Sequence, residues 1–401
     1  MTAARGRVGS GTAVWLTAFA FAAAMLGTTL PTPLYPHYEQ QFRFGPLTVT
    51  LVYAAYAVGV LAALLAFGRA SDTLGRRPVL LAALALSGTS SLVFVLVGAM
   101  SSGGLPLLFT GRVLSGLSAG MFTGTATAAL ADFAEEDNQL RASVIAAVAN
   151  IGGLGLGPLV SGLLARHAGR PLQTSYLVHV VVVVLAVAAI LAVPEPVRPD
   201  GPRRLRFQRL GVPAVARAAF LQAGTAGFAG FALLGLFTAV SPSVLALLGH
   251  HNPALTGVVV FAVFAASAAG QVVSATLPAR PALLAGTGVL VLGLAVLGIS
   301  LARSSLPLLV IAGVIGGAGQ GLSFRAALGL VTQVSPTEQR GGVASSFFAV
   351  VYVGISLPVV GIGVGTREYG LVHTGEVFAA ILAVLALLAL TSLALRKPRA
   401  V

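Results

Sequence analysis

The sequence has 401 residues, of which 57% are hydrophobic and only 9% are charged, and it contains no cysteine. This apolar share lies far above that of soluble domains and indicates an integral membrane protein, and the lack of cysteine excludes disulfides, thiolate catalysis and Cys-ligated metal sites. The net charge of +13 could suggest nucleic-acid binding, but no interleaved basic and aromatic patch accompanies it.

Apolar runs broken by polar residues, glycine or proline predict twelve membrane-spanning helices, because one span needs roughly 20 mostly apolar residues. In chain order the expected ranges are 11–33, 46–67, 78–97, 104–131, 142–165, 172–193, 213–246, 254–275, 281–302, 305–332, 342–364 and 374–395. The first run is too long for a cleaved signal peptide, so we interpret it as a span. The predicted fold is an all-α integral membrane protein.

The basic residues are sorted by loop. With the N-terminus inside, seventeen of them fall in segments that would face the cytoplasm and five in the opposite loops. This is the positive-inside pattern, so the charge indicates topology and not a nucleic-acid partner. We expect a multi-pass protein of the plasma membrane, or inner membrane, with both termini in the cytoplasm.

The two halves of the chain carry similar patterns. The stretch TLGRRPVLL at 73–81 returns as TLPARPALL at 276–284, and Pro158 and Pro358 are 200 residues apart. A glycine stripe with one arginine also occurs in both the fourth and the tenth predicted helix. The segment 194–212, rich in proline and arginine, is typical of a linker. We expect two pseudo-symmetric six-helix halves, 1–193 and 213–401, joined by this cytoplasmic linker, an architecture of secondary transporters.

Three motifs resemble those of the major facilitator superfamily, and the resemblance covers essentially the whole chain. The matching residues are Gly68, Asp72, Gly75, Arg76 and Arg77 for motif A, Arg112 and Gly116 for motif B, and Gly153, Gly157, Pro158 and Gly162 for motif C. Motif C is typical of proton-driven drug antiporters, so the resemblance implies efflux of a small organic solute by alternating access. It also implies that a basic residue of motif A pairs with Asp132. Proton-coupled uptake of an anionic or neutral metabolite is the alternative, because fold and motif A serve both directions.

The charges of motif A are expected to form a conformational latch in a cytoplasmic turn. Gly68 and Gly75 imply close backbone approach, and the charged side chains can meet opposite charges or helix ends. A plain positive-inside loop with solvated charges is the alternative. The second copy has Ala275 where the first has Asp72, so we expect a stronger latch in the first half. In motif C, glycines four residues apart allow close helix packing and Pro158 can bend the helix, which predicts packing or a hinge.

Polar residues inside the predicted spans are the candidates for solute binding or coupling. Arg112 and Arg325 lie within helices, where an arginine usually faces a cavity or a partner, although Arg325 could instead extend to the lipid headgroups. Buried amides need partners that a water-filled site supplies, which adds Asn150, Gln271 and Gln320. No Asp or Glu lies well inside any predicted span, and this disfavours cationic solutes.

The remaining polar residues predict little further chemistry. We expect His179 to be packed or lipid-facing, and the pair His250 and His251, in a short loop without a nearby acid, to be solvated and not a metal site. HExxH does not occur, and we expect no enzyme and no cofactor. The expected partners are a small-molecule solute, protons and membrane lipid, and we expect a monomer. If protons couple to transport, the carboxylate candidates are Asp72, Asp132 and Glu39.

Overall fold

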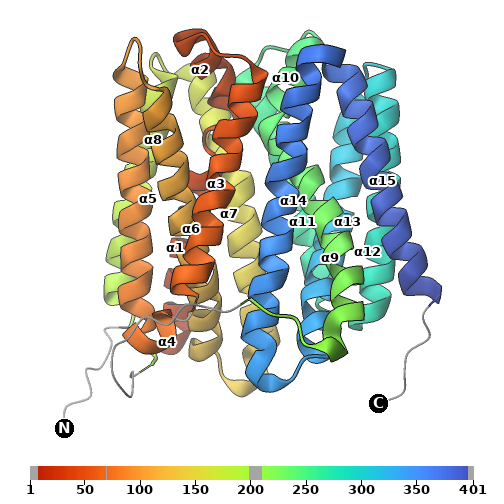
Figure 1. Ribbon diagram of the computed structural model, residues 1–401. Coiled ribbons are helices and arrows are strands. Elements are labelled where there is room, and N and C mark those ends of the chain that lie inside the picture. Colours follow the sequence, from red (N-terminus) through yellow and green to blue (C-terminus); the bar gives the residue numbers. More distant parts are fainter. Residues whose placement is uncertain (1–7, 69, 198–209, 396–401) are drawn as a thin grey trace. The chain divides into compact units, whose positions relative to one another are not determined.

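The computed structural model describes residues 8–68, 70–197 and 210–395 (Figure 1). Twelve of its helices are long and apolar enough to cross a membrane, and the described residues contain no strand. The prediction of an all-α membrane protein with twelve spans in two pseudo-symmetric halves is therefore confirmed. Most of the predicted linker, 198–209, and both chain ends lie outside the described residues.

The spans have the following bounds. Those of the first half are α1 (Ser10–Thr29), α3 (Pro46–Phe67), α5 (Arg76–Ala99), α6 (Leu105–Phe133), α7 (Gln139–His167) and α8 (Pro171–Ala192). Those of the second half are α9 (Arg217–Ala239), α11 (Pro253–Ser274), α12 (Ala279–Ala302), α13 (Leu306–Gln333), α14 (Arg340–Tyr369) and α15 (Leu371–Leu395). Three shorter helices are α2 (Tyr35–Phe42), α4 (Ala70–Leu74) and α10 (Ser241–Leu247).

Two predicted runs are interrupted by proline. The first ends as α1 at Thr29, because Pro31 and Pro33 cannot donate backbone hydrogen bonds, and a short 3-10 turn leads into α2. The seventh is divided into α9 and α10, with Pro242 in the first turn of α10, where a missing N–H costs little. Both interruptions follow from the missing backbone N–H of proline, which a hydropathy profile does not detect.

The described residues group into two compact units. The first lies within Met1–Phe44, Ala55–Arg209 and Asn252–Val258, and the second within Gly45–Ala54, Leu210–His251 and Val259–Val401. The first turns of α3 thus group with the second unit, and the first turns of α11 with the first unit.

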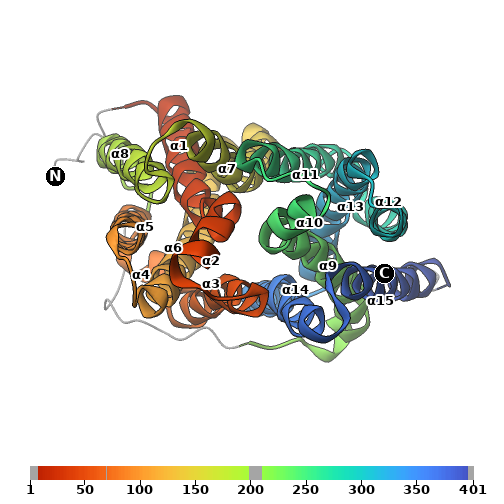
Figure 2. The same cartoon turned by 90° about the horizontal axis from the view of Figure 1, so that it is seen from above.

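Helix packing repeats from one unit to the other. In the first unit α1 packs on α6, α7 and α8, and α5 packs on α6 and α8 (Figure 2). In the second unit α9 packs on α13, α14 and α15, and α12 packs on α13 and α15. Each of these pairs in the first unit has a counterpart in the second, so the internal repeat of the sequence is also a repeat of tertiary packing.

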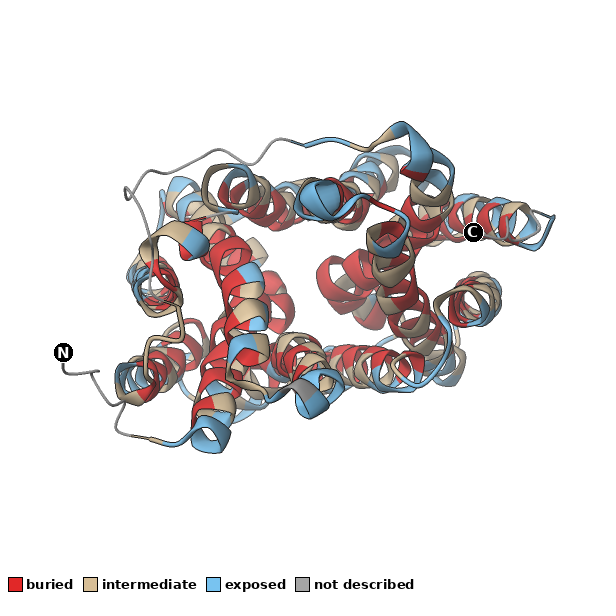
Figure 3. Ribbon diagram, turned by 90° about the horizontal axis from the view of Figure 1, so that it is seen from below, coloured by how far each residue is buried: buried red, intermediate tan, exposed pale blue. Residues whose placement is uncertain are grey.

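Burial follows the helix faces. In both units the buried residues lie on helix sides that face other helices, and the exposed residues lie on the outward sides (Figure 3). The outward sides of α8 and α15 are lined with exposed valine, leucine and isoleucine, which suits contact with lipid chains. In the second unit Phe231, Phe324 and Phe347 form an aromatic core, with ring centroids 5.0 and 5.9 Å apart.

Candidate functional site

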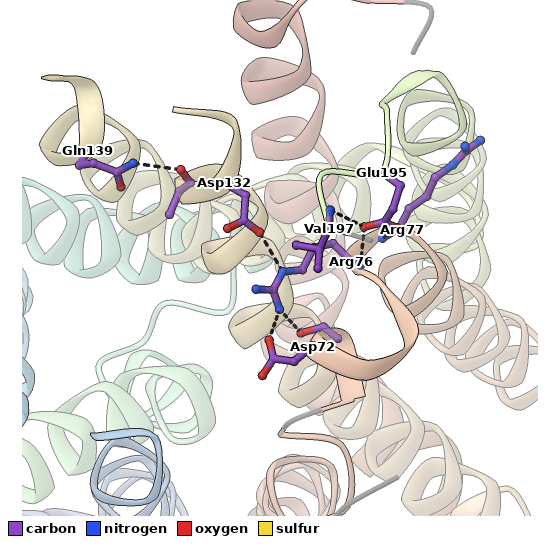
Figure 4. Close-up of polar contacts among 9 residues, drawn as sticks. Asp72, Arg76, Arg77, Asp132, Gln139, Glu195 and Val197 are labelled. Atoms are coloured by element: carbon purple, nitrogen blue, oxygen red, sulfur yellow. Dashed lines mark hydrogen bonds and ion pairs between the residues drawn. The ribbon is translucent and has the colours of Figure 1, made fainter. Parts of the chain in front are cut away.

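Arg76 is the centre of the motif A contacts (Figure 4). Its Nε donates to Asp132 Oδ2 at 2.9 Å, and its Nη1 donates to Asp72 Oδ1 at 2.6 Å and to Ser71 Oγ at 2.7 Å. The arginine side chain is only 12% exposed, whereas the Asp72 side chain is 58% exposed. One arginine thus joins the turn between α3 and α5 to the end of α6, and the expected pairing of a motif A arginine with Asp132 is present.

Arg77 and Glu195 bind the ends of two helices. Arg77 Nη2 donates to the Leu191 carbonyl in the last turn of α8, at 2.6 Å, where helix carbonyls lack internal partners. Glu195 accepts the backbone N–H groups of Arg76 and Arg77 at 2.8 and 2.9 Å, so its carboxylate caps the N-terminus of α5. The sequence analysis missed Glu195, which follows the sixth span in the segment PEP; an acid just beyond a helix end was the only available signal.

The two glycines of motif A differ in their surroundings. Gly75 precedes α5 with φ of 98°, a conformation that favours glycine, and a Cβ there would collide with the Glu195 carboxylate. Gly68 lies exposed in the turn after α3. Gly75 therefore shows the expected close approach. Asp72 contacts the Arg76 side chain, and the helix N-terminus is bound by Glu195.

The second copy of motif A keeps one of these contacts. Arg280 Nη2 donates to the Leu393 carbonyl near the end of α15 at 2.9 Å. This bond corresponds to the bond of Arg77 to Leu191: Arg77 lies 203 residues before Arg280, and Leu191 lies 202 residues before Leu393. Ala275, just after α11, offers no carboxylate at the place of Asp72. The repeat has thus kept the helix-end contact and not the ionic one.

Arg112 is buried between helices of the first unit. The residue is 2% exposed, its Nη1 donates to the Thr28 carbonyl at 2.6 Å, and its guanidinium lies 4.9 Å from the ring centroid of Tyr56. The Thr28 carbonyl belongs to the last turn of α1, where an arginine favourably meets the negative helix end. The π face of Tyr56 provides further compensation for the buried charge.

The motif B glycine and its repeat serve close helix packing. A Cβ at Gly116 on α6 would collide with the Tyr56 carbonyl of α3, and a Cβ at Gly317 on α13 would collide with the Val263 carbonyl of α11. Such contacts let two helix backbones approach each other, as small residues do in membrane proteins. The same glycine position therefore joins corresponding helices in each unit.

Motif C lies along the contact of α7 with α1. Gly153 and Gly157 face α1, where added Cβ atoms would collide with backbone or with Thr29, and Thr29 Oγ1 donates to the Leu154 carbonyl at 2.7 Å. Gly162 packs on the Pro253 carbonyl at the start of α11, within the same unit. Pro158 is buried inside α7. Motif C thus provides close packing, and a hinge at Pro158 stays a prediction.

The candidate polar residues of the second unit lie on α11 and α13. Gln320 is fully buried and its Oε1 accepts from Ser267 Oγ at 2.6 Å, whereas its Nε2 has no hydrogen-bond partner among the described residues. Gln271 follows Ser267 by one helical turn, and its buried Nε2 also lacks a partner there. Arg325, further along α13, is half-buried, as is Asn150 on α7 of the first unit.

His179 is packed between three helices. It is 1% exposed on α8, its Nε2 is 3.0 Å from the Ala23 carbonyl of α1, and its Nδ1 is 2.6 Å from Ser91 Oγ of α5. The carbonyl can only accept, so Nε2 carries the hydrogen and Nδ1 accepts from the serine. Gly27 leaves the space for the ring. The expectation was a packed or lipid-facing histidine, and the structure shows the packed one.

Comparison with known proteins identifies the family. The sequence profile of the Major Facilitator Superfamily matches residues 17–277, so the chain belongs to this superfamily. The crystal structure of a D-xylose-proton symporter is similar over 97% of this chain and 98% of that chain, with a TM-score of 0.77 and 14% sequence identity, which shows a shared fold. No curated protein matches the chain in sequence. Family and fold point to a multi-pass membrane transporter and not to an enzyme.

Proposed function

We propose that the chain exports a small organic solute by alternating access and couples this export to a proton gradient. The observation that carries the proposal is the contact set of Arg76, which joins the turn before α5 to the end of α6 through Asp72 and Asp132. Ion pairs of partly exposed groups contribute only about 0.2–1 kcal/mol each, so a conformational change can break them at small cost. This is the energetic property that a latch between two transport states needs.

Export is favoured over uptake by motif C. Its glycines line the contact of α7 with α1, and this motif is the feature that resembles drug antiporters. In this proposal the halves 1–193 and 213–401 move as bodies about the linker 194–212, in the plasma membrane, as a monomer with both termini in the cytoplasm. Proton-coupled uptake of an anionic or neutral metabolite is the second candidate, supported by the structural similarity to the D-xylose-proton symporter.

The solute is proposed to be neutral, zwitterionic or anionic. The candidate contacts are Arg112, Asn150, Gln271, Gln320 and Arg325, which offer donors and two positive charges but no carboxylate. The unpartnered Nε2 groups of Gln271 and Gln320 support this proposal most directly, because a buried amide donor without a partner is costly and a solute oxygen would satisfy it. A cation would meet no complementary charge among these side chains.

The test is solute flux in proteoliposomes under an imposed proton gradient. A screen for ligands that raise the melting temperature of the purified protein first identifies a solute. Export coupled to protons requires the solute to move against the direction of proton flow. Movement in the direction of proton flow would replace antiport with symport, and flux that ignores the gradient would remove proton coupling from the proposal. Gln320→Leu should weaken solute binding, whereas unchanged affinity would exclude this amide from the site.

A further inference from the structure

A cavity of about 720 Å³ is lined by residues of α2, α5 and α8. Figure 1 shows α2 at one end of the first unit and α4, which carries Asp72 of motif A, at the opposite end. The last turn of α5, the start of α8 and α2 form its walls, and all three belong to the first unit. Its polar lining side chains are His37, Gln40, Gln41, Arg170 and Gln173. A volume of this size is typical of small-molecule sites.

The walls of this cavity are fixed to one another. Gln41 Nε2 of α2 donates to the Val97 carbonyl of α5 at 3.3 Å, and the Tyr38 hydroxyl of α2 lies 3.2 Å from the Tyr176 hydroxyl of α8. The helices α5 and α8 pack directly on each other. The cavity is therefore preformed, so a ligand would not have to order its walls on binding.

The lining has the charge and hydrogen bonding of an oxyanion site. Arg170 and His37 are its ionisable residues, and no carboxylate lines it, since Glu39 of α2 is not part of the wall. Arg170 is exposed, and Gln40 and Gln173 line the same cavity and carry amide donors. The Nδ1 of His37 is buried without a hydrogen-bond partner among the described residues. These groups together fit the planar, multidentate recognition that guanidinium and amide donors give a phosphate.

The depth of the cavity suits a ligand at the membrane surface. Arg170 lies between the span that ends at His167 and the span that begins at Pro171, and Ala99, which also lines the cavity, is the last residue of its span. Lipid headgroups are found at this level. The apolar part of the lining, which includes Pro171 and Leu172, can contact the organic part of a ligand larger than a bare anion.

We propose that this cavity binds a phosphate ester, with Arg170 as the charged contact and Gln40 and Gln173 as hydrogen-bond donors. The same chemistry is found in the headgroup of an anionic phospholipid and in a small soluble phosphate ester. The site is separate from motif A and from the proposed solute contacts, and it does not depend on the direction of transport.

The experiment measures binding to the purified full chain in a neutral detergent. The probes are dihexanoyl phosphatidylglycerol and glycerol phosphate, each titrated while the melting temperature is followed. We expect at least one probe to stabilise the wild type, and Arg170→Gln to weaken its apparent affinity at least tenfold, because a hydrogen bond to a charged group contributes about 1.5–3 kcal/mol. Gln173→Ala should weaken it less. Arg166→Gln is the matched control, since Arg166 is an exposed arginine four residues earlier that does not line the cavity.

The outcomes separate the two sources of phosphate. Stabilisation by the lipid alone assigns the cavity to a headgroup, and stabilisation by glycerol phosphate assigns it to a soluble ester. No stabilisation by either probe would refute the proposal. So would unchanged affinity in Arg170→Gln, or an equal loss in Arg166→Gln, because the latter would mean that the probe responds only to net charge.

Discussion

Removing the Glu195 carboxylate should open the N-terminus of α5. In Glu195→Ala the backbone N–H groups of Arg76 and Arg77 lose their acceptors, which lie at 2.8 and 2.9 Å in the native protein. Hydrogen bonds to a charged group contribute about 1.5–3 kcal/mol each, and the half-buried position of Glu195 places both near the lower end. The free energy of the local opening that exposes these two amides to hydrogen exchange should therefore fall by about 3 kcal/mol.

Hydrogen–deuterium exchange of the peptide that contains Arg76 and Arg77 measures this change. At tenfold per 1.4 kcal/mol, two amides should exchange roughly a hundredfold faster in Glu195→Ala. Glu195→Gln keeps one amide oxygen as an acceptor and should accelerate them about tenfold. Glu368→Ala is the control, because Glu368 is an exposed acid in the last turn of α14. Exchange within twofold of the wild type in Glu195→Ala would show that Glu195 does not cap this helix in the membrane.

Three further tests address the latch and the helix contacts. Asp72→Asn should strongly reduce transport while the protein still inserts and purifies, and wild-type flux in liposomes would remove the latch from the mechanism. Gly27→Ala should lower the melting temperature by several degrees, because the added Cβ would collide with the His179 ring. Adding His179→Ala to this variant should recover part of the loss, and no recovery would contradict the contact. Gly116→Ala should also destabilise the protein, whereas Gly124→Ala, which has open space, should not; equal melting temperatures would argue against close packing at Gly116.

The fold was predictable because hydropathy, charge sorting and repeats each report on the whole chain. Twelve long apolar runs correspond one to one with the spans of the structure. The pairing of a motif A basic residue with Asp132 followed from the resemblance of the motifs, and the structure gives Arg76 as that residue. Arg280 was visible in the sequence as part of the repeat of motif A. These features depend on composition or spacing, which a sequence displays directly.

The missed features depend on which groups meet in space. Glu195 lies 119 residues from the N–H group of Arg76, and no spacing rule connects the two. The contacts of Arg112 with Thr28 and Tyr56 likewise come from helices that are far apart in the chain. Helix periodicity places such residues on a face, but it does not say which carbonyl or ring will face them.

The repeated arginine contact has a consequence for assembly during synthesis. Arg77 binds a carbonyl of α8, and Arg280 binds a carbonyl of α15. In each half, therefore, an arginine at the start of an early helix can form this bond only after the last helix of the same half has been synthesised. Neither bond uses a residue from the other half. Since a chain generally folds from its N-terminus as it is made, the first six spans can complete their own helix-end bonding before the seventh span leaves the ribosome. Each half therefore completes this helix-end contact between two of its own spans, independently of the other half.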